Sequence, residues 1–326
     1  MNPRVSIVIE AYNEEQNALA PPIDTLRALR RQPFPMELVE LVLIGSPEQI
    51  ECWDHFHPEF EGFGWVRLLP VDSSRSHYWE LKNQGAAAAT APLVAFIDCD
   101  ALPGPEWLPA LVSALENGAD VSVGPSLYRS PKLGAESPWM QAVSLPSWSF
   151  ILAGASSAET PREGALAAHN LGIRRELALA HPFVTLHRSF CSSLLFFELK
   201  RAGARFSYNP GQRVAHGWNF RWWLGRMHFR RGWETWEGRS LDPDWPRMPL
   251  LEALKYIEPL VLRTALICRD TCHWLRFGRV IGLSRGRVLL LWPLAVCASA
   301  TARAAETVGM YAGLLAPRST AWQARF

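Results

Sequence analysis

The chain has 326 residues, of which 48% are hydrophobic and 20% charged, so it can build a sizeable core and is not a disordered chain. Its formal net charge of +2 is too balanced for a protein that binds nucleic acid mainly by counterion release. The fifteen tryptophans are the main departure from average composition, and several of them lie late in the chain.

The first hundred residues predict strands that alternate with helices. Continuous apolar runs, typical of strands buried on both faces of a parallel sheet, occur at 4–12, 36–45, 64–71 and 92–100. Helical stretches lie between them at 21–32 and 80–91. The alternation predicts an α/β fold with a doubly wound, mostly parallel sheet. Such sheets bind ligands at the carboxyl ends of their strands.

The middle of the chain continues this pattern with longer loops. A helix is predicted over 106–118 and a strand over 119–128, followed by loops and helices over 129–165 that are rich in Ser, Pro and Gly. The next segments read as a strand and helix, a helix, and a strand, at 168–177, 192–203 and 204–218.

The C-terminal part predicts long apolar helices over 249–275 and 287–317. The longest uncharged run, 288–302, has 15 residues and contains Pro293, which is fewer than the ~20 residues that span a bilayer. We therefore expect an interfacial helix or a buried helical hairpin, with a membrane surface as a candidate partner. Packing on the protein itself or on a second copy is the alternative.

The N-terminus and the cysteines bear on the compartment. The chain enters a strand almost at once, without a cationic stretch followed by an apolar run, so we expect no signal peptide. The six cysteines are widely scattered, which predicts free thiols in a reducing, cytoplasmic setting. Attachment to the periphery of a membrane stays open because of the C-terminal helices.

The fourth predicted strand ends in two carboxylates, Asp98 and Asp100, one residue apart. Such a pair can clamp a divalent cation, which then neutralises a diphosphate. An ordinary Asp-rich turn is the alternative. Several other nucleotide sites are excluded, because the chain has no G-x-G-x-x-G after a strand and no G-x-x-x-x-G-K-[ST]. It also lacks the G-x-S-x-G of a hydrolase nucleophile.

Four further stretches surround this pair in an order that resembles the family-2 glycosyltransferases of the GT-A fold. They are SIVIEAYNEEQN, LKNQGAAAATAPLVAFIDCDALP, HNLGIRRELA and LKRAGARFSYNPGQRVAH. The resemblance covers about residues 4 to 217 and implies a GT-A domain over 1–240. The nucleotide-binding half would be 1–100 and the acceptor half 101–217, with a helical region over 241–326.

The resemblance implies a role for individual residues. Tyr12 would stack on the nucleotide base and Glu14 would lie near the ribose and the metal. The full nucleotide-binding set is Ala11, Tyr12, Glu14, Lys82, Asn83 and Asp98. Mn²⁺ or Mg²⁺ would be held by Asp98, Asp100 and His216, although a hydrogen-bonded histidine is the alternative for the last. His169 and Asn170 would frame the donor and acceptor.

The segment 216–239 alternates arginines with tryptophans. Arg221 and Trp222 could hold a diphosphate and stack on a sugar ring. The alternatives are an amphipathic helix packed on the core and a belt at a membrane surface.

Two features depart from the family. The second strand ends in Leu43 and Ile44 where an aspartate normally reads the uracil edge, so the nucleotide base stays open. An inverting transferase also needs a base for the acceptor hydroxyl, and the family's carboxylate pair corresponds to Cys191 and Ser192. His187 or His181 could replace it.

The sequence thus supports two hypotheses. The first is a metal-dependent inverting glycosyltransferase that moves a sugar from a nucleoside-diphosphate donor to a hydroxyl acceptor on a glycan, a lipid-linked molecule or a small molecule. The second is a non-catalytic relative that binds a nucleotide-sugar or glycan as a partner or scaffold.

Overall fold

The computed structural model describes residues 2–11, 22–55, 57–72, 78–130, 137–155, 166–185, 190–236, 254, 256–281 and 283–315. The chain forms two compact units, and we describe each by itself. The first consists of Met1–Leu127 and Phe150–Gly217, and the second of Tyr128–Ser149 and Trp218–Phe326. The domain predicted over 1–240 therefore contains segments of both units.

A seven-stranded sheet, in the order β3-β2-β1-β4-β8-β6-β9, forms the centre of the first unit. Its strands are β1 (Val5–Glu10), β2 (Val39–Gly45), β3 (Trp65–Pro70), β4 (Leu93–Asp98), β6 (Val121–Val123), β8 (Asn170–Arg174) and β9 (Phe206–Tyr208). All pairs are parallel except those that β8 makes with β4 and β6. The predicted mixed α/β fold with a mostly parallel sheet is confirmed.

A second, three-stranded sheet has the order β5-β10-β7. Its strands are β5 (Ala101–Pro103), β7 (Ser126–Arg129) and β10 (Val214–Gly217). The strand predicted over 119–128 is thus divided into β6 and β7. The break lies at Gly124, where a Cβ atom would lie 1.9 Å from the carbonyl oxygen of Gln212, so only glycine allows this approach. The strand predicted over 204–218 is likewise divided, because Asn209–Gln212 form a turn.

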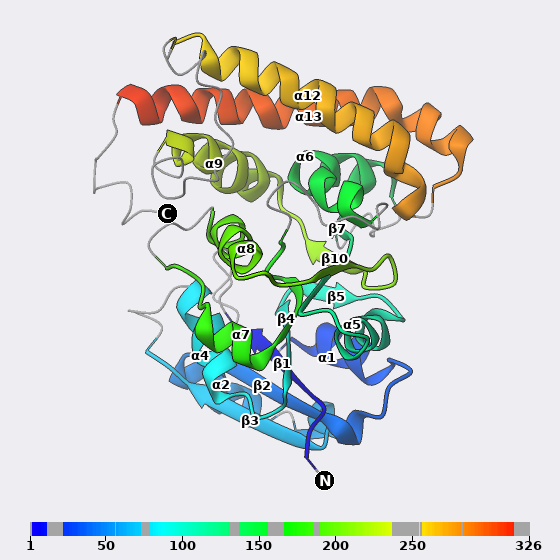
Figure 1. The fold of residues 1–326 in the computed structure, drawn as a ribbon, viewed down its shortest axis with the longest axis vertical. Helices are drawn as coiled ribbons and strands as arrows, with labels where there is room; N and C mark the ends of the chain where they lie inside the picture. The colour runs from blue at the N-terminus through cyan, green and yellow to red at the C-terminus, as the bar shows by residue number, and fades with distance from the viewer. Residues whose placement is uncertain are drawn as a thin grey trace. The chain divides into compact units, whose positions relative to one another are not determined.

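Helices cover both faces of the large sheet, with α4 and α7 on one side and α1 and α5 on the other (Figure 1). The helices of this unit are α1 (Ile23–Arg30), η1 (Met36–Leu38), α2 (Pro47–Asp54), α3 (His57–Phe60), α4 (Tyr78–Ala88), α5 (Trp107–Glu116), α7 (Arg175–Ala180) and α8 (Cys191–Arg201). Alternation along β1 sends Ile7 and Ile9 into the core beneath α1 and α5. Val8 faces α4 instead.

The second unit is helical. It contains the first part of α6 (Pro138–Ala155), the wide-turn helix η2 (Trp222–Phe229), α9 (Arg230–Trp233), α12 (Glu258–Phe277), η3 (Gly278–Ile281) and α13 (Arg285–Leu315). The helices predicted in the C-terminal part are present. Helix α13 is long and apolar enough to cross a membrane by length and composition, and 39% of its most apolar window is buried within the protein.

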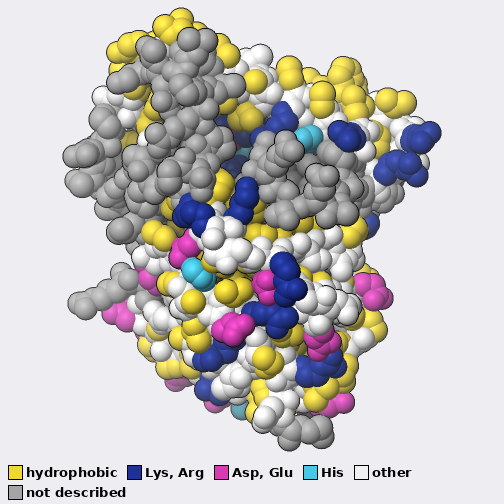
Figure 2. Space-filling model, in the orientation of Figure 1, with side chains coloured by type: hydrophobic (Ala, Val, Ile, Leu, Met, Phe, Trp, Pro, Cys, Tyr) yellow, Lys and Arg dark blue, Asp and Glu magenta, His cyan; other side chains and the backbone are white. Residues whose placement is uncertain are grey.

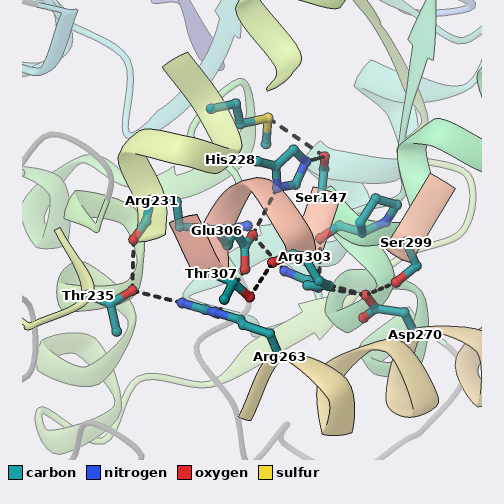
Figure 3. A network of polar contacts seen from close by, with 12 residues as sticks. Ser147, His228, Arg231, Thr235, Arg263, Asp270, Ser299, Arg303, Glu306 and Thr307 are labelled. Carbon is teal, nitrogen blue, oxygen red and sulfur yellow. Dashed lines mark hydrogen bonds and ion pairs between the residues drawn. The ribbon is translucent and has the colours of Figure 1, made fainter. Parts of the chain in front are cut away.

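Buried charges join the helices of the second unit (Figure 3). The carboxylate of Asp270 on α12 accepts hydrogen bonds from Ser149, Ser299 and Arg303. One turn further along α13, Glu306 pairs with Arg303, Arg263 and His228. Every charge of this network has an opposite partner, which buried ions require.

Candidate active site

The carboxylate of Asp98 lies at the carboxyl end of β4 and is directly opposite Glu10 at the end of β1. Glu10 is two residues from Val8, and Asp98 is two residues from Phe96. Because side chains alternate along a strand, all four lie on the same face of the sheet. Three donors surround Asp98. Tyr78 Oη lies 2.9 Å from Oδ1, Lys82 Nζ lies 2.8 Å from Oδ1, and His216 Nε2 lies 3.2 Å from Oδ2.

Burial by itself would raise the pKa of Asp98, but Lys82 and His216 together hold it well below its usual range. The carboxylate is therefore ionised and surrounded by protein cations. Its charge is available to a ligand only in competition with Lys82.

Lys82 reaches this edge because α4 packs closely on the sheet. A Cβ atom on Gly85 would lie 2.3 Å from Val8 Cγ1, so glycine at this position allows the close approach of the helix. The Lys82 ammonium is fully buried and also lies 2.8 Å from Glu10 Oε2. Burial would lower the pKa of Lys82, but Asp98 and Glu10 outweigh it and raise the pKa. Burial and the charge of Asp98 raise the pKa of Glu10 well above its ordinary value.

His216 on β10 lies between the two carboxylates of the predicted metal site. Its Nε2 is 3.2 Å from Asp98 and 3.5 Å from Asp100 Oδ1, while Nδ1 donates to the carbonyl oxygen of Gly217 at 2.8 Å. Burial would lower its pKa, yet Asp100 and then Asp98 raise it to about 9. The protonated ring of His216 thus offsets the negative charge of both Asp98 and Asp100.

His169 completes the cluster. Its Nε2 lies 2.8 Å from Ser126 Oγ, and its ring packs edge-on against His216 with centroids 4.8 Å apart. Burial, followed by the charge of His216, lowers its pKa to about 3, so the imidazole is neutral. Ligand atoms of Asp98, His169 and His216 all lie within 4.8 Å of one another.

A divalent cation fits this donor set of one carboxylate and two imidazoles once His216 has lost its proton. Asp100, whose side chain is the most exposed of the cluster, offers a further oxygen. The structure therefore brings together the three predicted ligands Asp98, Asp100 and His216. It adds His169, which the sequence had suggested for the sugar side.

Two other predicted residues are engaged inside the protein. Asn83 exchanges two hydrogen bonds with the backbone of Phe183, at 2.9 and 2.8 Å. Asn170 is fully buried and its amide binds Trp107, Gln212 and the carbonyl oxygen of Gly124. Both side chains thus hold neighbouring segments in place.

The remaining nucleotide-side residues are partly described. Ala11 is buried, and its N–H donates to the carbonyl oxygen of Ile44 at 2.7 Å. Leu43 and Ile44 are buried in β2. Tyr12, Glu14 and His187 lie outside the described residues.

The region predicted to hold the base begins α8. Ser192 is half-buried in the first turn, and Cys191 is buried with its thiol 2.7 Å from the carbonyl oxygen of Val184. Glu198 on α8 lies 2.8 Å from Nδ1 of His181. The sequence had suggested His181 as a base, and the structure adds Glu198 as its partner.

Arg221 and Trp222 belong to the second unit. Arg221 is exposed, and its backbone N–H donates to Asn219 Oδ1. Trp222 packs edge-on against Tyr128, with ring centroids 6.4 Å apart.

Sequence reasoning missed Tyr78 and Glu10. Tyr78 precedes Lys82 by four residues on α4, a spacing that places both on one helix face. Glu10 is the charged residue at the end of a mostly apolar, fully buried strand, which is a signal for a buried partner.

The geometry agrees with comparisons to known proteins. The family model described as glycosyl transferase family 2 matches residues 6–179, more than half of the chain. The chain belongs to glycosyl transferase family 2.

A glucosyl-dolichyl phosphate glucuronosyltransferase of Haloferax volcanii is 32% identical over 123 residues, which is 37% of each protein. An uncharacterised glycosyltransferase of Mycobacterium tuberculosis strain H37Rv is 38% identical over 73 residues, 22% of this chain and 32% of the relative. The matches thus span about a third of these relatives.

Solved structures of two transferases share the fold. The mannosyltransferase PcManGT of Pyrobaculum calidifontis, in complex with GDP-Man and Mn²⁺, aligns over 98% of this chain and 89% of its own, with a TM-score of 0.58 and 17% identity. Residues 1–349 of S. aureus TarS, in complex with UDP-GlcNAc, align over 97% and 93%, with a TM-score of 0.54 and 13% identity. At this identity the likeness shows the GT-A fold.

Proposed function

We propose that this family-2 protein is a metal-dependent glycosyltransferase that moves a sugar, with inversion, from a nucleoside-diphosphate donor to a hydroxyl acceptor. The observation that carries the proposal is the cluster of Asp98, Asp100, His169 and His216 at the carboxyl end of β4, where α/β sheets bind ligands. Mn²⁺ or Mg²⁺ held there would neutralise the charge of the leaving diphosphate.

The protein's own residues prepare this cluster. Tyr78 and Lys82 fix the carboxylate of Asp98 in one orientation. Lys82 is fully buried and would place positive charge near the donor phosphates without contacting water. His216 would have to lose its proton to hold the cation, so we expect cation binding to strengthen as the pH rises.

His181 is the described candidate for the base that accepts the proton of the acceptor hydroxyl. The carboxylate of Glu198 lies 2.8 Å from its Nδ1 and orients the ring, so Nε2 is the ring nitrogen that would accept the proton. His187 remains a second candidate. The two solved structures are complexes with GDP-Man and with UDP-GlcNAc, so the donor panel includes both. The Haloferax volcanii relative is named for a glucosyl-dolichyl phosphate, so the acceptor panel includes polyprenyl-phosphate sugars.

A binding protein without catalysis is the second candidate. It is favoured by the absence of a carboxylate at Cys191 and Ser192, the two positions where the family normally has one. A binding protein would take up the nucleotide and the metal but would not transfer or hydrolyse the sugar.

Calorimetric titration of UDP, GDP and dTDP, with and without Mn²⁺, tests the site. We expect one nucleotide to bind, with Mn²⁺ strengthening it at least tenfold, and Asp100→Ala to abolish the Mn²⁺ effect. Asp54→Ala removes an exposed carboxylate on α2 and should bind like the wild type. If no nucleotide binds the folded protein with Mn²⁺ present, the proposal is wrong.

Sugar transfer or donor hydrolysis by the wild type, lost in His181→Asn, would then favour the enzyme over the binding protein. Binding without any turnover on the donor and acceptor panels would favour the binding protein.

A further inference from the structure

Helices α12 and α13 each expose an apolar stripe on the side that faces away from the other helices of the second unit. On α12 the exposed apolar residues recur every three to four positions, which places them on one face of the helix. They are Ile257, Leu260, Val261, Ala265, Cys268, Cys272 and Leu275. On α13 they are Leu289, Leu290, Trp292, Pro293, Cys297, Ala304, Val308 and Leu315. Leu290 is 78% exposed and Leu289 is 66% exposed.

These two stripes are neighbours, because α12 and α13 pack against each other over their length (Figure 1). Hydrophobic side chains line this outer edge in the space-filling view (Figure 2). We call the two stripes together the hairpin face. An apolar surface of this extent on a folded protein marks an interaction site.

Positive charge accompanies the hairpin face where the two helices are joined. Arg276, Arg279, Arg285 and Arg287 are all exposed there, and dark blue side chains gather at this end in Figure 2. The single acidic residue of the sequence between 259 and 305 is Asp270, which is fully buried against Arg303. The exposed charge of this stretch is therefore entirely positive.

The opposite side of α13 decides how the helix can meet a partner. Its buried residues run from Val288 to Gly313 and include Arg303 and Glu306. These charges are paired with Asp270, Arg263 and His228 of the same unit (Figure 3). Turning α13 across a bilayer would break the pairs and expose the ions to lipid, which is costly. The helix can meet a membrane only by lying along its surface.

We propose that the hairpin face is a docking surface for an anionic lipid bilayer, on which α12 and α13 lie flat. Leucines and Trp292 would enter the boundary between headgroups and acyl chains, and the four arginines would bind lipid phosphates. Charge complementarity selects this partner. A second copy would present the same cations, and nucleic acid would leave the leucines exposed to water. The inference does not depend on the proposed transfer reaction.

Co-sedimentation of the full chain with phosphatidylcholine vesicles, with and without phosphatidylglycerol, tests the docking. We expect binding to the anionic vesicles, weakened by salt, and much weaker binding to the neutral ones. The double variant Arg285→Gln/Arg287→Gln should lower the partition coefficient on anionic vesicles by on the order of twentyfold. Leu289→Gln/Leu290→Gln should lower it on both kinds of vesicle.

The control Arg31→Gln/Leu179→Gln changes one exposed arginine and one exposed leucine in the first unit and should bind like the wild type. Since all substituted side chains are exposed, circular dichroism should show every variant folded. Equal binding by all variants, or none to anionic vesicles, would overturn the proposal. A wild type that is dimeric and does not bind vesicles, with a monomeric Leu289→Gln/Leu290→Gln variant, would show that the hairpin face binds a second copy instead.

Discussion

Lys82 is a buried cation between two buried carboxylates, and the three groups are not equivalent. The pKa of Asp98 is lowered and that of Glu10 is raised, so the ammonium has Asp98 as its main counter-ion. Removing the cation takes away the main counter-ion of Asp98 and leaves only His216 beside it among the described cations, and we expect Lys82→Met to destabilise the protein by about 3 kcal/mol. Glu10→Gln keeps an oxygen that accepts from Lys82, and it replaces a carboxyl group whose raised pKa favours the protonated form. The substitution should therefore lower the unfolding free energy by about 1 kcal/mol or less.

Urea denaturation measures both changes. Lys200→Met is the matched control, because Lys200 is exposed at the end of α8, and it should stay within about 0.5 kcal/mol of the wild type. Equal losses for Glu10→Gln and Lys82→Met would show that Glu10 is ionised and is a full partner of the pair.

The sequence predicts the position of the carboxylates in this site but not their partners. Asp98 and Asp100 were predicted because local pattern places them at the end of a strand. Their partners Lys82 and His216 were expected to contact ligand, whereas the structure places both against Asp98. Which side chain neutralises a carboxylate depends on contacts between segments as far as 118 residues apart, and no local pattern encodes them.

At the scale of elements, Asp270 holds α12, α13 and α6 together. It accepts a hydrogen bond from Ser149 on α6. It also accepts hydrogen bonds from Ser299 and Arg303 on α13 (Figure 3). Asp270→Ala would leave the buried guanidinium of Arg303 with one carboxylate fewer. We expect a loss of about 3–5 kcal/mol in unfolding free energy for the second unit.

Thermal unfolding followed by circular dichroism checks this expectation. Asp270→Asn keeps the shape of the side chain and one acceptor oxygen but no charge, so its melting temperature should lie between those of the wild type and Asp270→Ala. An unchanged melting temperature in Asp270→Ala would mean that the helices are joined by their apolar contacts alone. The buried ion pairs would then no longer be a reason for α13 to lie along a membrane surface.

At the scale of the whole molecule, buried histidines make stability depend on pH. His228 is buried beside Glu306, and burial lowers its pKa from 6.5 to about 4, so the folded state favours the neutral ring. The unfolded chain binds the proton more tightly, and stability is therefore lost as the pH falls from 6.5 toward 4. Integration of this shift gives a loss on the order of 2 kcal/mol between pH 7.5 and pH 5. Burial would raise the pKa of Glu306, but Arg303 lowers it, so its contribution is lost at still lower pH.

Urea denaturation at pH 7.5 and pH 5 tests this expectation, and His228→Gln should reduce the difference between the two values. His216 has the opposite sign: its pKa of about 9 gives stability that is present below 6.5 and lost as the pH rises through 9. We therefore expect maximal stability near neutral pH. A protein equally stable at pH 5 and pH 7.5 would contradict the buried, neutral state of His228.

The sequence by itself determined the alternation of strands and helices, the sheet class and the position of Asp98 and Asp100 at a strand end. These follow from local periodicity, since a buried parallel strand must be a continuous apolar run. The tertiary structure alone decided the division of 119–128 into β6 and β7, the pairing of Lys82 with Glu10 and the meeting of His169 with His216. The physical reason is that each depends on which distant backbone comes close, as the carbonyl oxygen of Gln212 does at Gly124.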